Sequence, residues 1–241
     1  MKQATFASTV YERLRKDIIS AALAPGHKLN IKMLCDRYGT GLSPIREALN
    51  RLSGDGLVIQ TDRRGFRVVP LSEVHLTELI KTRIWLNEIA VRESIANGGQ
   101  EWEESVVLAH HRLSRTPRRL TGSLGGAENP AWEDAHRQFH ASLIAACGSS
   151  WLIRYCEQLF DAAERYRHLS RQALRQKTGP RDDEHKLIME AVVARDVGNA
   201  VELLRQHLLA TAELVRAWTR RLQAPGSRGR AERGVRISSA H

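Results

Sequence analysis

The stretch from Ser43 to Leu52, SPIREALNRL, constrains the fold of this chain more than any other. Ser43 is a good helix cap, and Pro44 after it is tolerated at the first helical position because an N–H is not needed there. Three apolar side chains recur at helical spacing on one side: Ile45, Leu49 and Leu52. We therefore expect a short amphipathic helix with a basic outer face.

Two helices are expected before this stretch. Thr9 and Glu12 have the spacing of a capping box, which predicts a first helix over residues 10–23. Asn30 is expected to cap a second helix over residues 31–38. Both predicted helices are short and amphipathic, as in a small helical domain.

A hairpin is expected after the third helix, which we place at residues 44–54. β-Rich runs over residues 57–60 and 66–69 are joined by a turn over residues 61–65. Three helices followed by a hairpin predict a winged helix-turn-helix. The alternative is a small helical domain with a solvated basic face and no DNA contact.

The outer face of the third helix carries the candidate DNA contacts. In a winged helix-turn-helix this helix enters the major groove by its N-terminus. Arg46 is the first candidate for a base contact, because guanidinium pairs bidentately with guanine. Ser43 and Asn50 share its face. Lys32, Arg63 and Arg64 are expected to contact phosphate. Gly65, in the wing, completes the candidate DNA-binding residues.

The positive charge of the chain is unevenly distributed. Residues 1–70 carry 12 lysines and arginines against 6 acidic residues, whereas residues 71–222 carry 21 against 20. A basic segment attracts a polyanion through counterion release, although it also serves solubility. The tail, residues 223–241, carries 4 basic residues against 1 acidic residue and is rich in Gly and Ser, so we expect it to be disordered.

No membrane partner is expected. The chain has no apolar run of the roughly 18 residues that span a bilayer, and its N-terminus lacks a signal-peptide pattern. Its three cysteines, Cys35, Cys147 and Cys156, cannot all pair and form no CxxC motif. We therefore expect a cytoplasmic protein with unpaired, buried thiols.

Residues 71–222 are expected to form a second domain, which gives three parts: residues 1–70, residues 71–222 and the tail. Helix signals in the second part predict an antiparallel bundle of about six helices, so the fold class is mainly α. A glycine-rich segment over residues 118–129 is expected to be a mobile loop. The expected helices cover residues 73–96, 102–115, 130–147, 150–174, 182–195 and 197–222.

Four histidines lie on the apolar faces of three of these expected helices. His136 and His140 have i, i+4 spacing, which places them one above the other. His185 and His207 each share a helix face with apolar residues of their own expected helices. A single inward histidine is more often an ordinary core residue. Four together favour a divalent metal site, because imidazole is a common ligand and helix bundles often hold metals.

The run from Pro25 to Ser72 resembles the N-terminal domain of GntR-family transcriptional regulators throughout its length. The resemblance implies a homodimer that binds a palindromic operator in double-stranded DNA, with a repressor as the expected role. Two positions depart from the family. Leu42 and Lys32 stand where the family commonly has arginine. Because Leu42 cannot donate a hydrogen bond, we expect an operator sequence that differs from the usual one.

The segments HRQFHASLIAACGSSWL and EHKLIMEAVVARDVGNAVELLRQHL resemble the FCD effector-binding domain of the FadR-type subgroup. The resemblance implies a metal held by His140, His185 and His207 and by an acid four residues before His140. His136 stands at that fourth position. An all-imidazole set favours zinc, with nickel or copper as alternatives, over manganese or magnesium. We expect a small carboxylate effector at or near this metal, its charge neutralised by Arg83 or Arg165.

Other interpretations remain open at this point. Glu133 with His136 has the Glu-x-x-His spacing of di-iron bundle enzymes, and Asp182 with His185 repeats it. A di-iron site also needs bridging carboxylates, which we do not find, and the N-terminal domain would be unexplained. A DNA-binding regulator with a structural metal or with no effector is the nearer alternative.

Overall fold

The computed structural model describes residues 6–61, 65–120, 129–174 and 182–223. Packing divides the chain into two compact units. One takes in the described residues of 1–79, 160–176 and 211–241, and the other those of 80–159 and 177–210. None of the described helices is long and apolar enough to cross a membrane.

Three helices open the first unit: α1 (Phe6–Ile19), α2 (Ile31–Tyr38) and α3 (Leu42–Gly54). Their shared core is made mainly of buried aliphatic side chains, among them the fully buried Leu14, Leu34 and Leu49. Burial of each such side chain contributes about 1.5–3 kcal/mol. Helix α2 begins as expected, with the Asn30 side chain accepting a hydrogen bond from the backbone N–H of Met33.

Two expected helix starts among these three helices are wrong. Helix α1 begins at Phe6, so Thr9 and Glu12 lie inside it and form no capping box. Helix α3 begins at Leu42 after an extended Gly41, and Ser43 therefore lies in its first turn instead of capping it. Helix α1 also stops earlier than expected, because the chain turns at Ala21, whose φ is 58°.

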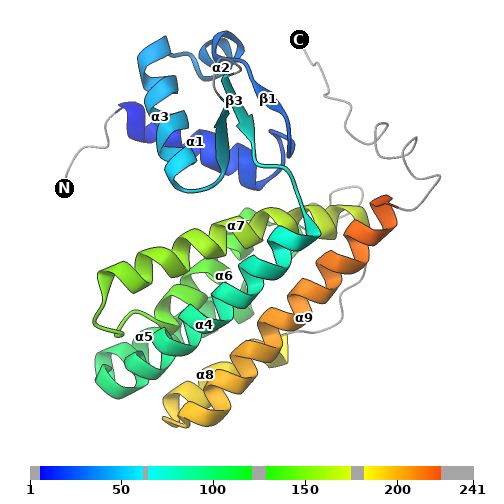
Figure 1. The fold of residues 1–241 in the computed structure, drawn as a ribbon. Coiled ribbons are helices and arrows are strands. Elements are labelled where there is room, and N and C mark those ends of the chain that lie inside the picture. Colours follow the sequence, from blue (N-terminus) through cyan, green and yellow to red (C-terminus); the bar gives the residue numbers. More distant parts are fainter. Residues whose placement is uncertain (1–5, 62–64, 121–128, 175–181, 224–241) are drawn as a thin grey trace. The chain divides into compact units, whose positions relative to one another are not determined.

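The wing is a sheet of three described strands, β1 (Lys28–Leu29), β2 (Val58–Thr61) and β3 (Gly65–Val68), in the order β1-β3-β2 (Figure 1). The expected hairpin is confirmed. Strand β1 was missed, because two residues are too few to show an alternating pattern. Both pairs are antiparallel, with Lys28 opposite Arg67 and Val58 opposite Val68. The three helices with this sheet form a winged helix-turn-helix.

Six described helices make the bundle, and the mainly α fold class is confirmed. They are α4 (Glu73–Asn97), α5 (Gln100–Arg115), α6 (Pro130–Leu143), α7 (Ser150–Leu174), α8 (Asp182–Val193) and α9 (Val197–Gln223), shown in Figure 1. Helix α6 ends four residues earlier than expected, before a turn in which Gly148 has φ 73°. Residues 121–128 of the expected mobile loop and residues 224–241 of the expected disordered tail lie outside the described residues.

The expected free thiols are present. Cys147 and Cys156 are buried and Cys35 is partly buried, and none of the three is in a disulfide. Burial raises the pKa of Cys156 to about 11, so this thiol stays protonated at neutral pH. Cys147 and Cys156 therefore act as small core residues.

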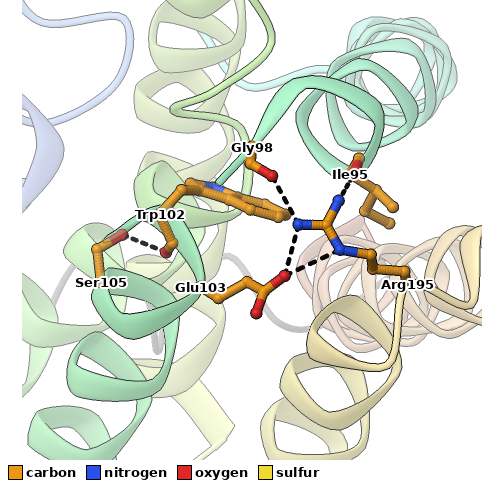
Figure 2. A network of polar contacts seen from close by, with 6 residues as sticks. All are labelled: Ile95, Gly98, Trp102, Glu103, Ser105 and Arg195. Atoms are coloured by element: carbon orange, nitrogen blue, oxygen red, sulfur yellow. Dashed lines mark hydrogen bonds and ion pairs between the residues drawn. The ribbon is translucent and has the colours of Figure 1, made fainter. Parts of the chain in front are cut away.

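Arg195 joins the turn between α8 and α9 to the α4–α5 corner (Figure 2). Its Nη1 donates to the carbonyl of Ile95 at 2.7 Å, and its Nη2 donates to the carbonyl of Gly98 at 2.6 Å. Its Nε donates to Glu103 at 2.9 Å. Gly98 has no room for a side chain, since a Cβ there would lie 2.1 Å from the Trp102 ring. Arg195 thus satisfies carbonyls at the end of α4 that the helix cannot satisfy itself.

We expect Arg195→Ala to lower the free energy of unfolding by about 1.5–3 kcal/mol, the usual value for hydrogen bonds to a charged group. Urea unfolding of the full chain measures this loss. Arg205→Ala is the matched control, because Arg205 makes an exposed ion pair with Glu202 within one helix. An Arg195 variant as stable as the Arg205 variant would contradict this role.

Candidate metal centre and DNA-binding face

Helix α6 presents two of the four histidines. Its N-terminus is capped by Asn129, whose side chain accepts a hydrogen bond from the N–H of Ala131 at 3.1 Å, and Pro130 occupies the first turn. His136 and His140 lie one turn apart and are both buried, and their Nε2 atoms are 3.1 Å from each other. The expected i, i+4 pair is therefore present.

The other two histidines come from the following helices of the same unit. His185 lies on α8 and His207 on α9, and both are buried. The centres of their rings are 4.7 Å apart. One ligand nitrogen from each of the four histidines can be chosen so that all lie within 4.8 Å of one another. The structure thus brings together all four residues expected to bind a metal.

Aromatic side chains support the cluster. The Trp132 ring stacks on His136 with 4.9 Å between the ring centres. Phe139, fully buried, contacts His140 and His185 edge to face at 5.5 and 5.3 Å. These rings limit how far the imidazoles can rotate, so the ligand nitrogens are held near one another before any metal binds.

A carboxylate contacts one imidazole from outside the cluster. Glu184 Oε2 lies 2.8 Å from His207 Nδ1. Neither Glu184 nor Trp132 was predicted from the sequence to belong to the site. Trp132 is four residues before His136, so helical spacing could have indicated it. Glu184 gave no such signal, because its contact crosses from α8 to α9.

The donor set fits a divalent metal of borderline softness. Four imidazole nitrogens converge in a buried place, and zinc, nickel and copper all accept imidazole as a ligand. Among the described residues no carboxylate or thiol belongs to this cluster, and Glu133 and Asp134 lie outside it. A di-iron centre takes carboxylates as bridging ligands, so this donor set does not support the enzyme alternative.

The outer face of α3 is exposed where DNA contacts are expected. Ser43, Arg46 and Asn50 are exposed, whereas the apolar side of the helix is buried. Lys32 on α2 is exposed, and Gly65 at the wing has φ 81°. Arg63 and Arg64 lie outside the described residues. Leu42, at the start of α3, is 61% exposed and presents an apolar side chain beside this face.

Comparison with known families finds a match for the winged helix-turn-helix and a match for most of the helical bundle. The bacterial regulatory proteins of the gntR family match residues 6–68, and the FCD domain matches residues 78–210. The chain belongs to the GntR family. It is a DNA-binding transcriptional regulator with an FCD domain, and both resemblances inferred from the sequence are confirmed.

Proteins similar to this chain are named as transcriptional regulators. The HTH-type transcriptional repressor GlaR of Escherichia coli is 36% identical over 210 residues, which cover 85% of this chain and 93% of GlaR. The uncharacterized HTH-type transcriptional regulator BphR of Paraburkholderia xenovorans is 38% identical over 86% of this chain and 83% of its own.

Solved structures share the fold of this GntR-family protein. McbR/YncC of E. coli has a TM-score of 0.73 at 19% identity and covers 88% of this chain and 98% of its own. A putative transcriptional regulator GntR from Rhodococcus sp. RHA1 has a TM-score of 0.67 at 22% identity. The match covers 88% of this chain and 97% of the Rhodococcus chain. At these identities the likeness supports the architecture alone.

The two arginines expected to bind an effector lie in different units of the GntR-family chain. Arg83 on α4 belongs to the unit that contains the histidines, and its side chain is buried. Arg165 on α7 belongs to the other unit and is only 1% exposed. Among the described residues, no group accepts a hydrogen bond of ordinary geometry from any of its guanidinium nitrogens. Burial lowers the pKa of Arg165, and the nearby Tyr166 hydroxyl opposes this shift.

Proposed function

We propose that this GntR-family regulator is a repressor whose operator affinity is controlled by a small carboxylate metabolite. The metabolite would bind at or near a divalent metal held by His136, His140, His185 and His207, with zinc as the first choice and nickel or copper as alternatives. The observation that carries the proposal is the convergence of four buried imidazole ligand atoms within 4.8 Å. A metal there would act as a Lewis acid for an anionic ligand.

Two buried arginines support a carboxylate as the effector. A guanidinium binds a carboxylate through two parallel hydrogen bonds, and burial makes an uncompensated positive charge costly. Arg165 is buried beside Tyr166 and has no carboxylate acting on it among the described groups. An anion that pairs with Arg165 would relieve the cost of its burial. Arg83 is the alternative, because its buried side chain lies in the same unit as the four histidines.

The DNA side of the proposal rests on α3 and the wing. Arg46 would read a base edge, with Ser43 and Asn50 beside it on the exposed face. Lys32, Arg63, Arg64 and Gly65 would contact phosphate and the DNA backbone. Two copies of the chain would read the halves of a palindromic operator, since a two-fold dimer matches a two-fold site. The repressor role is supported by the name of GlaR.

The test measures operator affinity of the full chain on a fragment found by footprinting the DNA next to its own gene. Affinity is measured with zinc, with a chelator, and with zinc plus each of a panel of small carboxylic acids. We expect one class of acid to weaken operator binding only when the metal is present. The metal content of untagged protein should be one ion per chain.

Variants separate the parts of this proposal. One of the two variants Arg83→Met and Arg165→Met should abolish the response to the acid, because one of the two positive charges is needed to bind it. The variant that loses the response identifies the arginine that binds the acid. Arg167→Met is the control, because Arg167 lies on the same helix as Arg165 but pairs with Glu164 at 2.5 Å. If neither metal nor any acid changes operator affinity, the proposal that the protein senses a metabolite is wrong, and any bound metal is structural.

A further inference from the structure

One carboxylate lies a single hydrogen bond away from the four-histidine cluster. The Glu184 side chain on α8 contacts His207 on α9, with 2.8 Å between Oε2 and Nδ1. An ionised carboxylate can only accept hydrogen bonds, so the proton between the two atoms belongs to Nδ1 of the imidazole. The lone pair of a neutral His207 is then on Nε2.

This arrangement selects the ligand atom of His207. A histidine can bind a metal through either nitrogen, and the hydrogen bond made by the other nitrogen sets the choice. His136 and His140 already face each other through their Nε2 atoms. Glu184 therefore makes His207 offer the same kind of nitrogen as its neighbours.

The same contact supplies negative charge that the ligand set lacks. Four neutral imidazoles leave a divalent ion with its full charge, and the described cluster contains no acid. His207 is only 6% exposed, but the Glu184 side chain is 37% exposed. A carboxylate in this position keeps part of its hydration while its charge acts through the imidazole, so it avoids most of the cost of burial.

We infer that Glu184 is a positioning residue for the proposed metal site, which fixes the tautomer of His207 and compensates the charge of the bound ion from outside the ligand set. This inference rests on the proposed metal-dependent function. Glu184 takes over the electrostatic part of an acidic ligand, while His136 fills the coordination position.

Two substitutions test the two roles. Glu184→Gln keeps a hydrogen-bond acceptor but removes the charge, and Glu184→Ala removes both. We expect zinc affinity, measured by competition with a chromophoric chelator, to fall by about 10-fold in the first variant and up to about 100-fold in the second. Absorption spectra of the cobalt(II)-loaded proteins should show a ligand field in the two Glu184 variants that differs from that of the wild type. A loss of stability alone would not produce this difference.

A matched control lies on the same helix. Glu190 is exposed and pairs with Lys186 at 3.7 Å, so Glu190→Gln removes the same charge without touching a histidine. It should bind zinc as the wild type does. A Glu184→Ala variant that binds zinc as tightly as Glu190→Gln would overturn the inference.

The tautomer is tested without metal. Two-bond ¹H–¹⁵N correlation spectra of the metal-free chain at pH 8 should show the His207 proton on Nδ1 in the wild type. A mixture of the two tautomers is expected in Glu184→Ala and in Glu184→Gln, because an amide can donate to Nδ1 as well as accept from it. A proton on Nε2 in the wild type would overturn the inference. If the wild-type chain takes up no metal, the proposed metal-dependent function is wrong. The position of the His207 proton is measured without metal, so it still shows whether Glu184 fixes the tautomer of His207.

Discussion

His140→Ala should abolish stoichiometric zinc binding by the full chain. His140 Nε2 lies 3.1 Å from that of His136, and all four ligand atoms fall within 4.8 Å, so its removal leaves three donors. Loss of a ligand should exceed the effect of losing an outer contact, and we expect affinity to fall by more than about 100-fold. Metal analysis after dialysis measures this directly.

The same variant should lose stabilisation by the metal. A ligand that binds only the folded chain stabilises it, and each tenfold loss of affinity removes about 1.4 kcal/mol of that effect. Thermal unfolding with and without zinc should therefore differ less in His140→Ala than in the wild type. His111→Ala is the control, since His111 is exposed and outside the cluster. Equal zinc binding in both variants would refute the site.

Arg46→Ala is expected to weaken operator binding and to relax its specificity at one base pair. A bidentate arginine–guanine contact contributes about 1–3 kcal/mol of discrimination, or roughly 5- to 150-fold. Binding to unrelated DNA should change far less. Affinities for the operator and for single-base variants of it, at one fixed salt concentration, measure the effect.

Two other basic residues serve as controls for Arg46. Arg51 lies on the same helix, but its guanidinium stacks over the Tyr11 ring at 4.1 Å, so Arg51→Ala should leave base preference unchanged. Lys32→Ala should weaken binding to all sequences alike and reduce the salt slope by about 1. If Arg46→Ala behaves like Lys32→Ala, Arg46 is a phosphate contact.

Helical spacing was the most reliable guide to the candidate site. His136 and His140 were expected on one face because they are one turn apart, and both are buried beside each other. The burial of His185 and His207 followed from their positions among apolar residues. Only packing could show that the three helices bring the centres of these rings within 4.5 to 6.4 Å of one another.

The boundaries of elements were less predictable. Ser43 looks like a cap by its residue type, yet α3 starts one residue before it, after Gly41. Ala21 ends α1 with a positive φ that alanine rarely adopts. Strand β1 exists because Lys28 and Leu29 find partners on β3. In each case a tertiary contact or a turn outweighs the local preference of the residue.

The sequence by itself determined the two kinds of domain, the exposed face of α3 with Arg46, and the four histidines, because side-chain periodicity is a local property of a helix. Only the tertiary structure decided the partners of these residues. Glu184 meets His207 because α8 and α9 pack together, and Arg195 holds the turn between them against the end of α4. Such hydrogen bonds join residues far apart in the chain, and no periodic pattern within one helix records them.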